Sequence, residues 1–254
     1  MAISQSDSDQ PDTAQSDAAI AGHEAAAGVH RSTLVDLTQL IKTPENYNFF
    51  SFRPDVKKLI LAGAADTEHI SILWYTGPNG RVGRHFHAMT EAVYAIAGTQ
   101  TDVQGVYATG SLYFNPPGSS HAISYSTGFF LLAYASPPDF ENATSIEDFT
   151  PVHINTAEPH WEARYPFTTR QDGVRTYDIP LAPAGGLSAQ LIQSTTPESY
   201  AYNGNYLLVL EGRCCIDGRY FDPQMLVVAH TVAAQSYRIS AVAGHACLVF
   251  GLSF

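Results

Sequence analysis

Residues 85–91 read His-Phe-His-Ala-Met-Thr-Glu, and residues 116–121 read Pro-Pro-Gly-Ser-Ser-His. The flanking residues are typical of β-strands, in which alternate side chains point to the same face. His85 and His87 therefore face the same way, and Glu91 follows close behind. His121 comes from a separate strand, after the Pro-Pro-Gly turn. Three imidazoles and one carboxylate form a mixed nitrogen and oxygen ligand set, which suits Fe, Mn, Ni, Cu or Zn.

The spacing of these residues resembles the two signature motifs of the cupin superfamily. The first motif corresponds to His85-X-His87, three residues, Glu91, six residues and Gly98, and the second to Gly110, five residues, Pro116-X-Gly118, two residues and His121. Two positions depart from the family pattern, because Asn79 stands where a glycine is expected and Tyr125 where an asparagine is usual. Neither departure removes a ligand.

The resemblance implies a small β-barrel that holds one divalent transition metal per chain. Its ligands would be His85, His87, Glu91 and His121. A lone histidine in an apolar strand is more often a buried core residue than a ligand. Four ligand-type residues at two matching spacings favour the metal site over this alternative.

Composition limits the classes of partner. The formal net charge of −11 makes the chain acidic, so phosphate backbones would repel it and nucleic acid is not an expected partner. No apolar run is long enough for a membrane span, and the first residues lack the features of a secretory signal. The cysteines are Cys214, Cys215 and Cys247, a poor disulfide framework. We therefore expect a cytoplasmic protein with a small-molecule substrate, and a homo-oligomer, most simply a dimer.

The remaining pattern predicts the fold class. Short candidate strands broken by glycine recur between residues 91 and 135, and no segment keeps a 3.6-residue period. Such a rhythm is typical of antiparallel sandwiches and barrels. Together with the cupin resemblance, it predicts an all-β protein of two tandem cupin barrels, of the double-stranded β-helix or jelly-roll type.

Four segments are predicted along the chain. Residues 1–30 are polar and small, and are expected to form a disordered tail. Residues 31–140 are predicted as an N-terminal cupin with the metal site, and residues 141–160 as a linker or crossover. Residues 161–254 are predicted as a second, degenerate cupin.

The second cupin is inferred from a weak internal repeat. Residues 205–212 resemble residues 91–98, with Gly212 over Gly98. This alignment places Ser199, Ala201 and Asn205 at the positions of the first three ligands, and it sets the region of Gln235 opposite His121. These residues make a poor ligand set, so the C-terminal cupin is predicted to have lost its metal.

The strand phase leaves alternatives for the walls of the site. Val93 and Ala95 are expected to face inward, with Phe114 or Tyr113 and with Trp74 or Tyr75. Such walls predict a largely apolar or aromatic small molecule. Arg53, Arg81 and Arg84 could meet an acidic substrate at the mouth, but solvated surface positions are the simpler interpretation.

Three functions are compatible with the site. The first is an Fe(II) dioxygenase acting on a small enol, diketone or phenolic compound. The second is a non-oxidative hydrolase, isomerase or decarboxylase, and the third is a metal-binding sensor or binding module. Residues 115–122 resemble both anti-sigma-factor cupins and a dihydroxyacetophenone dioxygenase group. Iron is favoured because zinc supports no redox chemistry and no further carboxylate is apparent as a base for hydrolysis.

Overall fold

The computed structural model describes residues 32–143, 149–170, 173–230 and 233–254. The tail predicted for residues 1–30 lies outside the described residues, as do residues 144–148 of the predicted linker.

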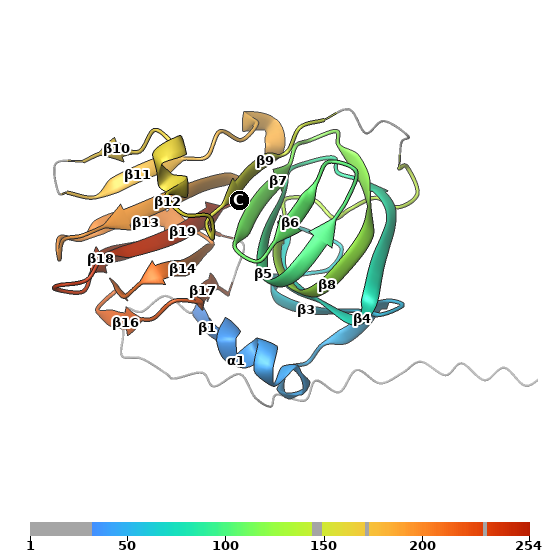
Figure 1. Cartoon of the computed structure of the whole chain (residues 1–254), viewed down its shortest axis with the longest axis horizontal. Helices are drawn as coiled ribbons and strands as arrows, with labels where there is room; N and C mark the ends of the chain where they lie inside the picture. Colours follow the sequence, from blue (N-terminus) through green and yellow to red (C-terminus); the bar gives the residue numbers. More distant parts are fainter. Residues whose placement is uncertain (1–31, 144–148, 171–172, 231–232) are drawn as a thin grey trace, which may run out of the picture.

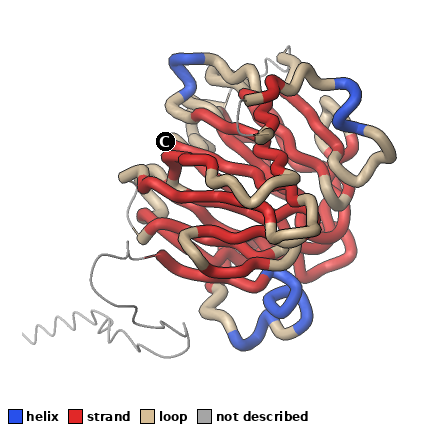
Figure 2. The backbone as a smooth tube through the Cα atoms, turned by 90° about the vertical axis from the view of Figure 1, so that its left-hand side faces the viewer, coloured by secondary structure: helices blue, strands red, loops and turns tan. Residues whose placement is uncertain are grey.

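Strands dominate the described chain and form three sheets (Figures 1 and 2). The N-terminal sheet contains, in spatial order, β2 (Phe50–Arg53), β3 (Val56–Gly63), β4 (His69–Phe86), β8 (Ser120–Tyr134), β5 (Glu91–Thr101), β7 (Ser111–Asn115) and β9 (Val152–Asn155), with β6 (Val106–Ala108) paired to β5. All neighbouring strands in this sheet are antiparallel.

The C-terminal half contributes two further sheets. The larger contains β1 (Ser32–Asp36), β17 (Met225–Ala229), β14 (Tyr206–Gly212), β19 (Cys247–Ser253), β12 (Ser188–Ser194), β11 (Arg175–Asp178) and β10 (Thr168–Thr169). The smaller contains β13 (Tyr200–Gly204), β18 (Gln235–Ala241), β15 (Cys214–Ile216) and β16 (Arg219–Phe221). The sheets are open but curved in jelly-roll fashion, which confirms the predicted all-β class.

Helix is scarce and peripheral among the described residues (Figure 2). The elements are α1 (Leu37–Lys42) and the 3-10 turns η1 (Pro44–Asn46), η2 (Trp161–Arg164) and η3 (Pro183–Gly185). Asp36 caps α1, since its side chain accepts a hydrogen bond from the amide of Gln39 at 3.0 Å. No described helix is long and apolar enough to cross a membrane.

Two strands cross between the halves. Strand β1 pairs with β17 in the C-terminal sheet, although the sequence prediction placed residues 31–140 together in the N-terminal cupin. Strand β9 pairs with β7 in the N-terminal sheet, although it lies within the predicted linker of residues 141–160. The two halves therefore exchange strands. Strand β1 precedes the N-terminal half and joins the C-terminal sheet, and β9 precedes the C-terminal half and joins the N-terminal sheet.

Strand β5 is buried on both faces, which explains its nearly continuous apolar sequence. Val93 and Ala95 face the interior of the N-terminal barrel, as predicted. Tyr94 faces the other way, into a core shared with the C-terminal half. Its hydroxyl accepts a hydrogen bond from the Nε2 of Gln224 at 2.9 Å, so the two halves are joined by polar as well as apolar contacts.

The strands that carry the site bend at glycines. Gly98 and Gly128 pair across β5 and β8, with φ of +97° and +91°. A side chain at either position would collide with the opposite backbone. The register also shifts between Ala95 and Ala97, so a bulge and a glycine pair together turn both strands around the barrel.

Candidate metal centre

The four predicted ligands come from three strand ends of the N-terminal barrel. His85 lies near the end of β4 and is paired in register with His121 at the start of β8. His87 follows β4 in a short loop, and Glu91 begins β5. The strand register and this loop therefore bring the two sequence motifs together.

The ligand atoms of this cluster, defined as His85, His87, Glu91 and His121, all lie within 4.8 Å of one another. The Nε2 of His87 lies 3.2 Å from the Nε2 of His121 and 3.3 Å from the Oε2 of Glu91. The Nε2 of His121 lies 3.7 Å from the same carboxylate oxygen. All four side chains are buried. Converging imidazole nitrogens and one carboxylate fit one transition-metal ion.

Hydrogen bonds at the outer edge of the cluster orient the candidate ligands. The Nδ1 of His85 faces the carbonyl oxygen of Gly83 at 2.9 Å, and the Nδ1 of His121 faces the Oδ2 of Asp102 at 2.9 Å. Each bond turns the Nε2 lone pair of its imidazole toward the centre. The Nδ2 of Asn115 donates to the Oε2 of Glu91 at 2.6 Å.

Asp102 and Asn115 were not among the residues predicted for the site. The expectation that no further carboxylate lies near the ligands was therefore wrong. The Oδ1 of Asp102 also accepts the amides of Gln104 and Gly105, at 2.8 and 3.0 Å. Because both of its oxygens are engaged, Asp102 is placed to orient His121 rather than to act as a free base. Asn115 precedes the Pro-Pro-Gly turn, and its pairing with Glu91 follows from the register.

The buried site favours neutral imidazoles. Burial, together with the neighbouring imidazoles, lowers the pKa of His85 and of His87 from 6.5 to about 3. The Nδ1 of His87 is buried and has no hydrogen-bond partner in the part of the chain that the structure describes. Neutral nitrogens present lone pairs to a metal without first losing a proton.

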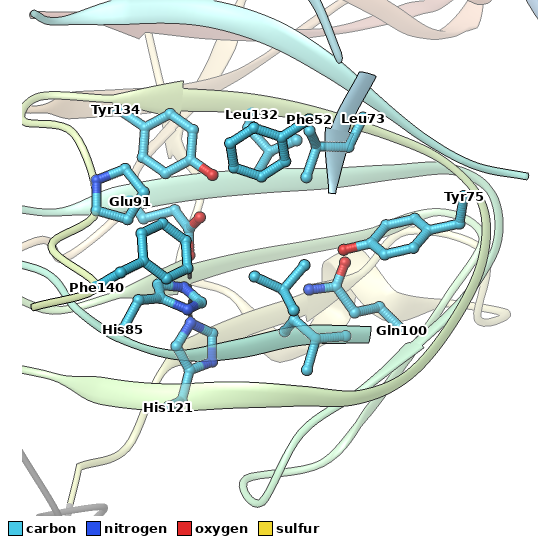
Figure 3. Close-up of a pocket in the computed structure, with 13 residues that line it drawn as sticks. Phe52, Leu73, Tyr75, His85, Glu91, Gln100, His121, Leu132, Tyr134 and Phe140 are labelled. Carbon is cyan, nitrogen blue, oxygen red and sulfur yellow. Dashed lines mark ion pairs between the residues drawn. The ribbon is translucent and has the colours of Figure 1, made fainter. Parts of the chain in front are cut away.

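A pocket opens beside His85, Glu91 and His121 (Figure 3). Its walls are mainly apolar and aromatic, and comprise Phe52, Leu73, Tyr75, Val82, Gln100, Ile123, Leu132, Tyr134, Pro138 and Phe140. Tyr75 lines the pocket, whereas Trp74 stacks on Phe129 at 5.5 Å outside it. The same phase turns Tyr113 into the barrel and Phe114 into the shared core.

The segment after β8 closes one side of the pocket. Phe86 and Asp139 exchange backbone hydrogen bonds of 2.8 and 2.9 Å, which hold Phe140 against His85 at a ring separation of 5.2 Å. The guanidinium of Arg53 lies 4.2 Å from the centre of the Phe140 ring. Arg53 therefore stacks on the pocket wall, while Arg81 is exposed as expected.

A buried lysine lies behind two rings of the pocket. The ammonium of Lys58 lies 5.1 and 5.0 Å from the ring centres of Phe52 and Tyr134. Its Nζ lies 2.7 Å from the Nε2 of His69, whose Nδ1 faces the carbonyl oxygen of Thr67 at 2.8 Å. His69 therefore accepts the hydrogen bond from Lys58 as a neutral imidazole.

In the described part of the C-terminal half, no loop between β13 and β14 corresponds to the one that carries His87. Gly204 pairs with Gln235, and Asn205 alone separates β13 from β14. The predicted alignment, which set Ser199 and Ala201 over the first two histidines, was wrong because the loop that carries His87 has no counterpart here. The Oδ1 of Asn205 accepts the amide of Phe254 at 2.8 Å. Apolar side chains fill the interior of this half.

Comparison with known families identifies the N-terminal unit. Residues 38–136 match the family model described as the ChrR Cupin-like domain. These residues form a cupin domain. No curated protein matches the sequence significantly.

Solved structures extend the cupin fold over most of the chain. A cupin 2 conserved barrel domain protein from Leptotrichia buccalis superposes with a TM-score of 0.55 at 13% identity, covering 90% of this chain and 99% of that one. A putative dioxygenase from Nostoc punctiforme gives 0.54 at 10% identity, with coverages of 88% and 83%. Salicylate 1,2-dioxygenase from Pseudoaminobacter salicylatoxidans, in adducts with gentisate, gives 0.51 at 12% identity, with coverages of 89% and 83%. At these identities the likeness concerns the fold.

Proposed function

We propose that this protein is a metal-dependent cupin dioxygenase that acts on a small enol, diketone or phenolic compound. The observation that carries the proposal is a buried cluster of His85, His87, Glu91 and His121 that opens onto an apolar and aromatic pocket. We propose Fe(II) as the metal, held by these four residues. Solved structures of similar fold include a putative and an established dioxygenase, which supports the proposal.

The residues around the cluster suit an anionic enolate or phenolate. Fe(II), when bound, would supply electrons for the reduction of dioxygen. Three neutral imidazoles and one carboxylate leave a divalent ion with residual positive charge, which favours an anion beside it. The apolar walls exclude water and strengthen this attraction. Asp102 and Asn115 hold His121 and Glu91 in place while the substrate enters.

Hydrolysis is less well supported by the arrangement. It needs a base that is positioned beside a metal-bound water. Asp102 has both oxygens engaged, and Glu91 is a proposed ligand. The hydroxyl of Tyr134, which lines the pocket, is a poor base, because burial raises its pKa well above 10.

The test compares two samples of the protein, one loaded with Fe(II) and the other with Zn(II). Metal content is first measured after purification without chelators. The Fe(II) form and the Zn(II) form are then screened in an oxygen electrode with small phenols and 1,3-diketones. We expect dioxygen consumption with the Fe(II) form alone. Equal turnover under strict anaerobiosis would reject the oxygenase and favour a hydrolase, isomerase or decarboxylase.

A metal-dependent binding module is the second candidate. The match of residues 38–136 to the ChrR Cupin-like domain supports it, since that match covers the metal cluster without implying turnover. This candidate predicts that ligands bind the metal-loaded protein but are recovered unchanged, with either metal and in air. Chromatography of the bound ligand separates it from the enzyme.

A further inference from the structure

The pocket has a second polar end, away from the metal cluster. Tyr75 on β4 and Gln100 on β5 both line the pocket. The exposed fraction of the surface is 3% for Tyr75 and 4% for Gln100. In Figure 3 their polar groups lie together on one side of the pocket, while His85, Glu91 and His121 lie on the opposite side. The apolar side chains of Val82 and Ile123 also line the pocket.

The polar atoms at this end are unsatisfied. The hydroxyl of Tyr75 and the Oε1 of Gln100 are buried and have no hydrogen-bond partner among the described residues. The hydroxyl of Ser126 lies beside that of Tyr75 without the geometry of a hydrogen bond. Native proteins leave few buried polar groups unpaired, because each one loses its hydration without compensation. Two such atoms that also line a pocket are therefore placed to pair with a bound ligand.

The two side chains are held in place by their surroundings. Gly80 has no side chain, and a Cβ there would overlap the Tyr75 ring. The ring also packs edge-on against Phe130, with centroids 5.6 Å apart. Gln100 is fixed on β5 opposite Ser126 of β8. The Tyr75 ring is thus held by packing and the Gln100 backbone by strand pairing, so both residues are anchored before a ligand binds.

We propose that Tyr75 and Gln100 form a second recognition point that binds a hydroxyl group of a ligand whose other end occupies the metal cluster. A hydroxyl suits both residues, since it accepts from the Tyr75 hydroxyl and donates to the Gln100 Oε1. The ligand class is a small molecule with a metal-binding end, an apolar middle and a distal alcohol or phenol. This inference rests on the proposed function, because it requires a ligand at the metal.

The test uses Zn(II)-loaded protein, which avoids redox chemistry, and two pairs of hydroxamates. Acetohydroxamate and glycolohydroxamate differ by one distal hydroxyl, as do benzohydroxamate and 4-hydroxybenzohydroxamate. Dissociation constants are measured by calorimetry. In at least one pair we expect the hydroxylated member to bind about tenfold or more tightly, because a buried polar site discriminates strongly against a ligand that leaves it unpaired.

Variants show which residues cause the preference for the hydroxylated probe. Tyr75→Phe and Gln100→Met should each reduce the preference for the hydroxylated probe, with little change for its partner probe. Tyr113→Phe is the matched control, because its hydroxyl is also buried and unpaired in this barrel but does not line the pocket. It should retain the preference.

Three outcomes would overturn the inference: no discrimination in either pair, a preference that survives in both variants, or metal-loaded protein that binds none of the probes. Each can occur while the Fe(II) form still consumes dioxygen, so the proposed function would survive. Protein that binds no metal would reject both proposals.

Discussion

The backbone amide of Thr90 donates a hydrogen bond to the carbonyl oxygen of Gly185 at 2.9 Å. Thr90 lies in the loop between His87 and Glu91, whereas Gly185 ends η3 in the C-terminal half. The bond therefore ties the ligand loop of one half to a turn of the other. It gives the C-terminal half a structural role beside the candidate metal site.

The first prediction concerns this contact. Gly185→Ala would place a methyl group against the Oγ1 of Thr90 and 3.3 Å from the Cγ of Pro117. The ligand loop must then shift, and we expect metal affinity to fall about tenfold, as for other residues that support metal ligands. Chelator competition measures the affinity, and circular dichroism checks the fold.

Thr90→Ala provides the matched partner for this change. It removes the Oγ1, which is buried without a hydrogen-bond partner, and makes room for the new methyl group. The double variant should therefore recover part of the lost affinity. If the two substitutions lower the metal affinity by strictly additive amounts, Gly185 affects the site through contacts other than the one with Thr90.

The second prediction concerns Asp102. Asp102→Ala removes the acceptor for the Nδ1 of His121 and frees the imidazole to rotate or change tautomer. Metal affinity should fall by about 10- to 100-fold. Asp102→Asn keeps an oxygen that accepts a hydrogen bond, so its loss should be smaller. Equal affinities for the wild type and Asp102→Ala would show that His121 is oriented by its packing.

The motif spacing was sufficient to predict that His85, His87, Glu91 and His121 come together. His85 and His87 are two residues apart near the end of one strand, so their direction follows from local geometry. The same strand phase correctly placed Val93 inside the barrel. The shared direction of His85 and His87 and the phase of β5 are local in sequence, and His121 could be assigned only because its own motif matched.

The missed features depend on contacts between distant residues. Asp102 reaches His121 only because a tight turn after β5 folds its carboxylate back, with the amide of Gly105 bound to it. The exchange of β1 and β9 between halves likewise depends on which sheet edge is free, and no local pattern encodes that choice. The loop that carries His87 was aligned wrongly because residues 205–212 resemble residues 91–98 in sequence, whereas the turn before β14 is shorter than the loop before β5.

The third prediction tests the ligand assignment. His87→Ala should abolish or greatly weaken binding of one metal per chain, because the nearby polar side chains of Asp102 and Asn115 are already engaged with His121 and Glu91. His153→Ala is the control, since the Nε2 of His153 lies 3.2 Å from the hydroxyl of Ser111, away from the cluster. Elemental analysis of both variants gives the stoichiometry. Full metal content in His87→Ala would contradict the assignment.

The last prediction concerns the buried charge of Lys58. Burial lowers its pKa from 10.5 to about 8, although the carboxylate of Glu91 opposes the shift. No carboxylate among the described residues forms an ion pair with Lys58. At pH 7 the ammonium is charged in both the folded and unfolded states, so folding bears the full cost of burying it.

Lys58→Met removes that cost and keeps an unbranched apolar chain between Phe52 and Tyr134. It also leaves the Nε2 of His69 unpaired, which offsets part of the gain. We expect the variant to be more stable at pH 7 by about 1–2 kcal/mol in free energy of unfolding. Urea denaturation of the two proteins at a series of pH values measures the difference.

The lowered pKa of Lys58 also determines how the free energy of unfolding changes with pH. Between about pH 8 and 10.5 folded Lys58 loses its proton while unfolded Lys58 keeps it, so the unfolded state binds more protons and wild-type stability rises with pH. The advantage of Lys58→Met should therefore be constant between about pH 6.5 and pH 8 and shrink across this window; below pH 6.5 His69 also titrates, and burial together with Lys58 lowers its pKa to about 4. A variant that is less stable than the wild type at pH 7 would show that the ammonium contributes more through His69 and the two rings than its burial costs.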